Sequence, residues 1–148
     1  AKAVALRECG TPAYQSYAKK VIENAQALAS GLVEEGMRAV SCGTQTHLAL
    51  IDIRATGVNG KVADERCGLS GITLNKNSIP YDPEKPAISS GIRVGTAATT
   101  TQGMGVGEMR QIASLIARAI KDGDDATKAQ AIKSEVKALT AKFPIYTR

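Results

Sequence analysis

Hydrophobic residues recur at spacings of three and four between positions 11 and 36, which predicts a long amphipathic helix. Thr11 can cap its first turn, Pro12 suits the position after a cap, and Gly36 can end the helix in the left-handed conformation. We expect the apolar stripe to pack against a sheet. The stripe consists of Tyr14, Tyr17, Val21, Ala25, Leu28 and Leu32.

Short apolar runs predict four strands in the middle of the chain. They cover residues 38–41, 47–53, 72–74 and 91–95, and Gly43-Thr44 suits a turn between the first two. Residues 75–90 are expected to form a loop. The prolines in this segment exclude a continuous helix; they are Pro80, Pro83 and Pro86.

Helical patterns return in four places. A short helix should follow a cap at Asn59 and extend to Cys67, and residues 96–101 suit one helical turn. Residues 103–107, which read G-M-G-V-G, suit a joint or helix entry before an amphipathic helix that ends at Gly123. Its stripe contains Met109, Ile112, Ile116 and Ile120. A last helix, capped by Asp124 or Asp125 and finished by Pro144, carries Ile132, Val136, Leu139 and Phe143.

The order of these elements predicts an α+β fold with a small, mainly antiparallel sheet and its helices on one face. The order is helix, strand, strand, helix, strand, strand, helix, helix. The second sheet face would then need a partner. Such an arrangement is typical of a small domain that closes over the active site of a larger one.

Composition narrows the classes of partner. A chain of 148 residues with 43% hydrophobic and 22% charged residues is one globular domain. The net charge of +5 is spread along the chain, and one phenylalanine without tryptophan gives little support for base stacking. No run approaches the ~20 apolar residues of a membrane span. We therefore expect neither a nucleic-acid partner nor a membrane partner.

The cysteines favour a reducing compartment. Cys9, Cys42 and Cys67 are odd in number, far apart in the sequence and without C-x-x-C spacing. This pattern argues against a disulfide framework and against a structural zinc site, so we expect a cytoplasmic protein. Cys42 and Cys67 lie in apolar patterns and should be buried thiols.

Arg93 is the strongest candidate for a binding residue. Alternation along residues 91–95 places Ile92 and Val94 on one strand face and Arg93 on the other, while Gly91 and Gly95 should leave room for a ligand. A guanidinium can bind a carboxylate or a phosphate through two parallel hydrogen bonds. An exposed strand arginine without a ligand is the alternative, and spacing alone does not separate the two.

Other candidate chemistry is weaker. Asn75, Lys76 and Asn77 precede the proline-rich loop, where a turn role is favoured by the sequence alone. His47 is the only histidine and begins an apolar strand, which favours a hydrogen-bonded structural role over catalysis or metal binding. No G-x-S-x-G motif exists, and the glycine-rich segment 103–107 lacks the ending of a phosphate loop.

Three motifs give the chain a resemblance to a known family. They are G-I-T-x-N-K-N-x-I-P at 71–80, D-P-x-x-P at 82–86 and S-G-I-R-x-G-T at 90–96. In these segments the sequence resembles the C-terminal domain of serine hydroxymethyltransferase. That family consists of fold-type I, pyridoxal-phosphate-dependent enzymes of one-carbon metabolism, which interconvert serine and glycine with transfer of one carbon to tetrahydrofolate. The resemblance extends to residues 1–6, 21–29, 43–48 and 108–116.

The resemblance implies roles for two residues. Arg93 would bind the α-carboxylate of serine or glycine, and Asn77 would contact the folate. It implies no catalytic residue, no cofactor-binding residue and no metal ligand in this chain. Pyridoxal phosphate would be bound mainly by an N-terminal large domain, and Lys61 and Lys76 should not replace that domain's Schiff-base lysine. The chain alone would be inactive, and the enzyme would be a homodimer or homotetramer.

The domain interpretation follows from the same resemblance. We expect residues 1–10 to be the end of a helix that links from a missing N-terminal large domain, and residues 11–148 to form the C-terminal small domain. Thr46, Ala97 and Gln102 depart from residues common in the family, which affects placement in a subfamily.

Two alternatives remain open at this stage. The first is the small domain of another fold-type I pyridoxal-phosphate enzyme, against which the N-K-N-x-I-P segment counts. The second is a stand-alone α+β regulatory module that binds amino acids or anions.

Overall fold

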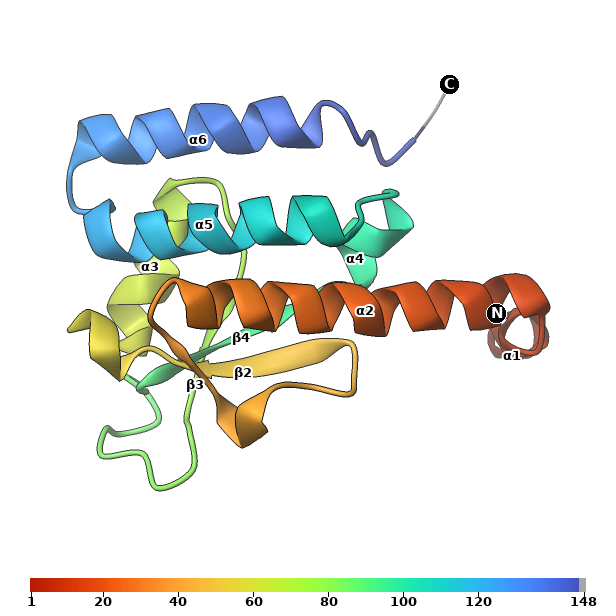
Figure 1. Ribbon diagram of the computed structural model, residues 1–148, viewed down its shortest axis with the longest axis horizontal. Coiled ribbons are helices and arrows are strands. Elements are labelled where there is room, and N and C mark those ends of the chain that lie inside the picture. The colour runs from red at the N-terminus through yellow and green to blue at the C-terminus, as the bar shows by residue number, and fades with distance from the viewer. Residues whose placement is uncertain (147–148) are drawn as a thin grey trace.

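The computed structural model describes residues 1–146 and confirms the predicted α+β fold, with an open four-stranded antiparallel sheet. The strands follow the order β1-β2-β4-β3, and the helices stack on one side of them (Figure 1). The helices are α1 (Lys2–Cys9), α2 (Pro12–Glu34), α3 (Gly60–Leu69), α4 (Ala97–Thr101), α5 (Val106–Asp122) and α6 (Ala126–Thr140). The strands are β1 (Arg38–Ala39), β2 (Leu48–Asp52), β3 (Asn75–Asn77) and β4 (Gly91–Gly95).

The register of β2 and β4 separates the two faces of the sheet. Ala49 pairs with Val94 and Ile51 pairs with Ile92, and all four side chains are buried under the helices. Arg93 pairs with Leu50 on one side and with Asn75 on the other, on the opposite face. The alternation predicted for residues 91–95 is therefore confirmed, because paired residues of an antiparallel sheet point to the same face.

Helix α2 begins and ends as predicted. The Thr11 hydroxyl accepts the backbone N–H of Tyr14 at 3.2 Å, and Gly36 has a φ of +93°. The C-terminal part of its apolar stripe is buried, whereas Tyr14 is 41% exposed because the first turns extend beyond the sheet (Figure 1). The stripe also packs on α5 rather than on the sheet alone. A Cβ atom at Gly31 would lie only 2.7 Å from that of Ala113.

The remaining helices follow the predicted caps. Asn59 accepts the N–H of Val62 at the start of α3, and Asp125, rather than Asp124, caps α6. The segment 103–107 leads into α5, where the Gly105 N–H donates to Glu108 at 2.8 Å. Helix α6 ends at Thr140, three residues before the predicted stripe ends at Phe143. Within residues 1–146, none of the helices has the length and apolar character needed to span a bilayer.

Two strand predictions were wrong. The third strand lies at Asn75–Asn77, inside the expected loop, and residues 72–74 are irregular. Asn and Lys have low strand propensity, but pairing with the central strand β4 overrides it. The first strand ends at Ala39, because Ser41 and Cys42 have φ values of 60° and 61°.

The early end of β1 also changes the environment of a thiol. Cys42 is exposed, contrary to the prediction, because the turn at 41–42 takes it off the sheet. Cys67 is buried as expected. Burial, with a smaller contribution from Asp64, raises the pKa of the Cys67 thiol to about 12. This thiol is therefore protonated and unreactive at neutral pH.

Candidate functional site

Arg93 lies in the middle of the uncovered sheet face. Its strand is central, with β2 on one side and β3 on the other, so its backbone is fixed by pairing on both sides. The Arg93 side chain is exposed. In the described part of the chain, residues 1–146, no carboxylate or other side chain bonds to its guanidinium. Arg93 is thus a cation on a strand that is held on both sides, and the N–H donors of its guanidinium are available to an anionic ligand.

The glycines beside Arg93 differ in what they do. A Cβ atom at Gly95 would lie 3.4 Å from the nearest atom, which is ordinary contact, so this side is open as expected. At Gly91 a Cβ atom would lie 2.6 Å from the Ile79 side chain and 2.9 Å from each of two backbone oxygens, those of Ile51 and Asn77. The prediction that Gly91 leaves room for a ligand was wrong. Its lack of a side chain instead lets the loop after Asn77 pack closely on β4.

Asn77 shares this face with Arg93. It pairs with Gly91, so it is a diagonal neighbour of Arg93, for which the Cα–Cα distance is typically ~7–8 Å. Its Nδ2 donates to the Ser78 carbonyl at 2.8 Å. Asn75, directly opposite Arg93, donates to the Lys76 carbonyl at 3.0 Å. The two residues that the sequence singled out, Arg93 and Asn77, are therefore close neighbours on one rigid surface.

A cavity of about 630 Å³ adjoins Arg93 at the C-terminal half of β4. Arg93, Asn75 and His47 belong to its lining, together with apolar side chains of α2, α5 and α6. From these helices come Leu28, Ile112, Leu115, Ile116, Val136 and Leu139, and from the strands and connecting segments come Leu48, Ile72, Leu74, Val94 and Met104. Arg93 therefore lies between an open sheet face and an apolar hollow, which is the setting of many small-molecule sites.

His47 differs from its predicted role. It precedes β2 and is exposed, and within residues 1–146 its imidazole has no hydrogen bond. Its backbone carbonyl instead accepts the N–H of Thr96 at 3.0 Å, which ties the start of β2 to the end of β4. The sequence could not show this, because backbone bonding does not depend on the type of side chain.

The loop from Ser78 to Ser90 is organised around Asp82, the first residue of the D-P-x-x-P motif, to which the sequence assigned no role. One Asp82 oxygen accepts the N–H groups of Ile79 (3.1 Å) and Ser90 (2.9 Å). The other accepts the N–H of Glu84 (2.9 Å) and the hydroxyl of Ser90 (2.6 Å). Burial alone would raise the pKa of Asp82, but the hydrogen bonds from Ser90, Glu84 and Ile79 lower it to about 2. The carboxylate is therefore ionised at neutral pH and holds a proline-rich loop in one conformation.

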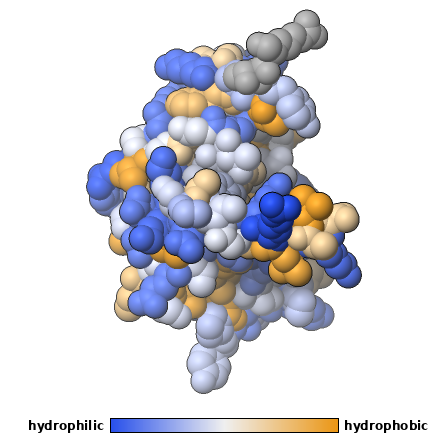
Figure 2. All heavy atoms as spheres, turned by 90° about the vertical axis from the view of Figure 1, so that its right-hand side faces the viewer, coloured by the Kyte–Doolittle hydropathy of each residue, from blue (hydrophilic) through white to orange (hydrophobic). Residues whose placement is uncertain are grey.

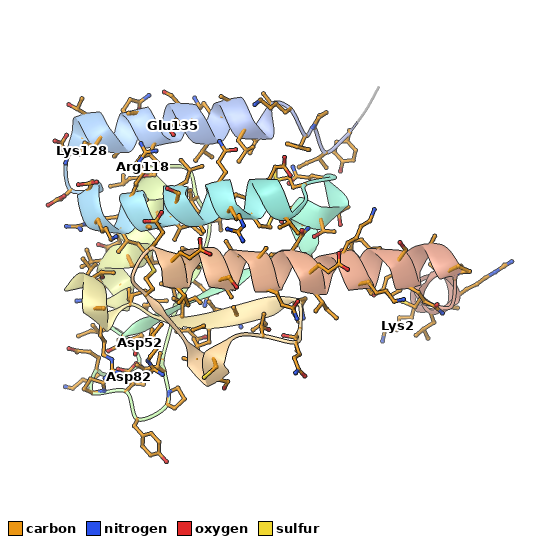
Figure 3. The ribbon with its side chains drawn as sticks, viewed as in Figure 1. Lys2, Asp52, Asp82, Arg118, Lys128 and Glu135 are labelled. Atoms are coloured by element: carbon orange, nitrogen blue, oxygen red, sulfur yellow. The ribbon has the colours of Figure 1, made fainter. Side chains whose placement is uncertain are left out.

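Another carboxylate with several partners, the buried Asp52, lies at the end of β2 (Figure 3). Arg38 and Arg54 each place a guanidinium nitrogen 2.8 Å from Asp52 Oδ2, and the Asp52 side chain is only 5% exposed. Hydrogen bonds from Arg54, then from Arg38, lower the pKa of Asp52 to about 2 against the opposing effect of burial. A pattern of apolar and polar positions could not reveal this cluster, because Arg38 reaches Asp52 through the pairing of β1 with β2, from 14 residues away in the sequence.

We expect Asp52→Asn to lower the free energy of unfolding by about 2 kcal/mol at pH 7, the value that corresponds to the lowered pKa of Asp52. A carboxyl whose pKa is lower in the folded state stabilises the fold above its unfolded-state pKa, near 4, and loses this contribution as the pH falls towards 2. Urea unfolding at pH 7, 4 and 2.5 should show that the difference in unfolding free energy between Asp52→Asn and wild type becomes smaller as the pH falls.

The exposed Asp124, which pairs with Arg66 at 3.3 Å, offers a matched control for that measurement. Asp124→Asn should change the unfolding free energy by less than about 1 kcal/mol at every pH. A difference between wild type and Asp52→Asn that stayed constant down to pH 2.5 would contradict the ionic role of Asp52.

The lysines near the site do not suit a covalent cofactor anchor next to Arg93. Lys76 pairs with Ile92, so it points to the sheet face opposite Arg93. Lys61 lies on α3 and approaches Glu65 at 4.0 Å.

Comparisons with known proteins agree with one another. The family model described as serine hydroxymethyltransferase matches residues 1–116. The chain is 46% identical over 146 residues to a curated protein of Paracidovorax citrulli (strain AAC00-1) named serine hydroxymethyltransferase. The match covers 99% of this chain but only 35% of that relative, so the chain spans about a third of the relative's length.

Proposed function

The chain belongs to the serine hydroxymethyltransferase family, and from this membership we propose that it forms the C-terminal small domain of an enzyme that interconverts serine and glycine. The hydroxymethyl carbon of serine would pass to tetrahydrofolate, which leaves glycine. The observation that carries the proposal is Arg93, which lies on a central strand one diagonal position from Asn77 and whose guanidinium bonds to no side chain of residues 1–146.

We assign binding roles, not proton transfer, to these two residues. Arg93 would hold the α-carboxylate of serine or glycine by two parallel hydrogen bonds, which fix both the position and the orientation of the amino acid. Asn77 would contact the pterin of the folate. Because Arg93 and Asn77 lie on paired strands, the sheet sets the distance between the two reactants.

The chemistry would come from the remainder of the protein. Pyridoxal phosphate supplies the electron sink for reactions at the amino-acid α-carbon in this family, and we propose that a preceding large domain binds it. Exposed apolar residues support a partner at one end of the chain. Helix α1 buries no residue, Val4 and Leu6 are 61% and 74% exposed, and orange and blue side chains lie together at this end (Figure 2).

On this basis residues 1–10 would be the end of a linking helix and residues 11–148 the small domain. The domain alone would be inactive. We further propose a cytoplasmic homodimer or homotetramer in which the uncovered sheet face closes over the active site.

A direct test uses the full-length protein that contains this chain. We expect the visible absorbance of bound pyridoxal phosphate and formation of glycine from serine that depends on tetrahydrofolate. Omission of tetrahydrofolate serves as the control. Cofactor binding without folate-dependent glycine formation would overturn the assignment and would favour another pyridoxal-phosphate enzyme of the same fold.

A further inference from the structure

The loop between Asn77 and Arg93 is closed by one carboxylate. Asp82 accepts the N–H of Ile79, two residues after Asn77, and the N–H and hydroxyl of Ser90, three residues before Arg93. A single side chain therefore bonds to both ends of the loop. The loop protrudes from the sheet at the bottom of Figure 1, and Asp82 lies near its base in Figure 3.

The two ends of the loop are held to the rest of the fold unequally. On the Arg93 side, two N–H groups at the start of α3 donate to backbone carbonyls of the loop. The bonds are from Gly60 to Ser89 at 2.8 Å and from Lys61 to Ile88 at 2.9 Å. The N–H of Ile53 also donates to Ser90 at 3.1 Å, and β2 pairs with all of β4. On the Asn77 side, β3 has three residues and lies at the edge of the sheet. After Asn77 the chain is also held by the 3.3 Å contact between the Ser78 and Ser89 hydroxyls and by the buried Ile79 side chain against Gly91. Asp82 adds to these the bond that fixes the backbone N–H of Ile79.

We propose that Asp82 is a positioning residue that holds Asn77 at its place relative to Arg93, and thereby aligns the folate with the amino acid. This inference rests on the proposed function. Asp82 acts through the backbone on both sides of it and does not itself contact a reactant. Arg93, anchored by β2 and α3, keeps its place without Asp82, whereas Asn77 does not.

The test is Asp82→Asn in the full-length protein. Asparagine keeps the shape of the side chain, but its NH₂ group cannot accept an N–H, so at least one of the four bonds is lost. We expect the KM for tetrahydrofolate to rise about 10-fold or more. The dissociation constant for glycine should change by less than about threefold, because Arg93 stays in place. If Asp82 only stabilised the fold, Asp82→Asn would weaken the binding of tetrahydrofolate and of glycine alike.

A double variant sharpens the result. In an Asn77→Ala background, Asp82→Asn should raise the KM for tetrahydrofolate by less than about a further twofold. The effects of the two substitutions should not add, because Asp82 acts through Asn77. Glu84→Gln is the matched control. Its exposed side chain lies in the same loop and only its backbone bonds to Asp82, so both ligand affinities should stay at wild-type values.

Ser90→Ala decides the question if Asp82→Asn does not fold. It removes only the 2.6 Å bond from the Ser90 hydroxyl and should raise the folate KM in the same direction, by about twofold to fivefold. An unchanged folate KM in a folded Asp82→Asn enzyme, or equal losses of folate and glycine affinity, would overturn the inference and leave the proposed function standing. A wild-type protein without folate-dependent activity would overturn both.

Discussion

Arg93→Ala in the full-length protein is expected to raise the KM for serine by about 100-fold while pyridoxal phosphate stays bound. Removal of one partner of a hydrogen-bonded charge pair costs about 2–5 kcal/mol, and each 1.4 kcal/mol is a factor of ten in affinity. The substrate carboxylate would lose the guanidinium that holds it, whereas β4 would lose no contact of its core face. Steady-state kinetics with serine and titration with glycine measure the effect.

Two further variants separate charge from geometry. Arg93→Lys keeps the positive charge but not the planar pair of donors, so its serine KM should lie between those of wild type and Arg93→Ala. Arg110→Ala removes another exposed arginine, whose contact is with Glu34 at 3.5 Å on the helical side. Its serine KM should stay within about twofold of wild type. Normal serine affinity in Arg93→Ala would remove the carboxylate role from Arg93.

The predictable parts of the fold were those fixed by local chemistry. The cap at Thr11, the left-handed Gly36 and the alternation around Arg93 are set within a few residues, and all three are confirmed. Strand β3 was missed because Asn75–Asn77 gain strand structure only from pairing with β4. The exposure of Cys42 depends on a turn with positive φ at two non-glycine residues, which the sequence does not announce.

The candidate site, too, could be predicted from the sequence only in part. Arg93 and Asn77 could be named from the sequence because their motifs resemble a family and because a strand alternates. Asp52 and Asp82 could not be found as hubs, since their partners lie on other elements or up to eight residues away. The glycines beside Arg93 look equivalent in sequence, yet the environment of Gly91 is set by the backbones of two neighbouring strands.

That difference between the glycines leads to the second large expected effect. Gly91→Ala should lower the free energy of unfolding by about 3 kcal/mol, because extra atoms in a packed region force the surroundings to move. The new Cβ would meet backbone oxygens of Ile51 and Asn77 at 2.9 Å, and these belong to the strands on both sides of β4. Chemical unfolding monitored by circular dichroism measures the loss.

Gly95→Ala is the matched control on the same strand and the same face. Its Cβ would lie 3.4 Å from the His47 carbonyl oxygen and 3.8 Å from Leu48, so its unfolding free energy should stay within about 1 kcal/mol of wild type. Gly91→Ala should also weaken folate binding, because any shift that relieves its clash moves Asn77. If Gly91→Ala and Gly95→Ala had the same unfolding free energy, β3 and the loop could move away from the new Cβ without loss of stability. Asn77 would then not be held rigidly against β4.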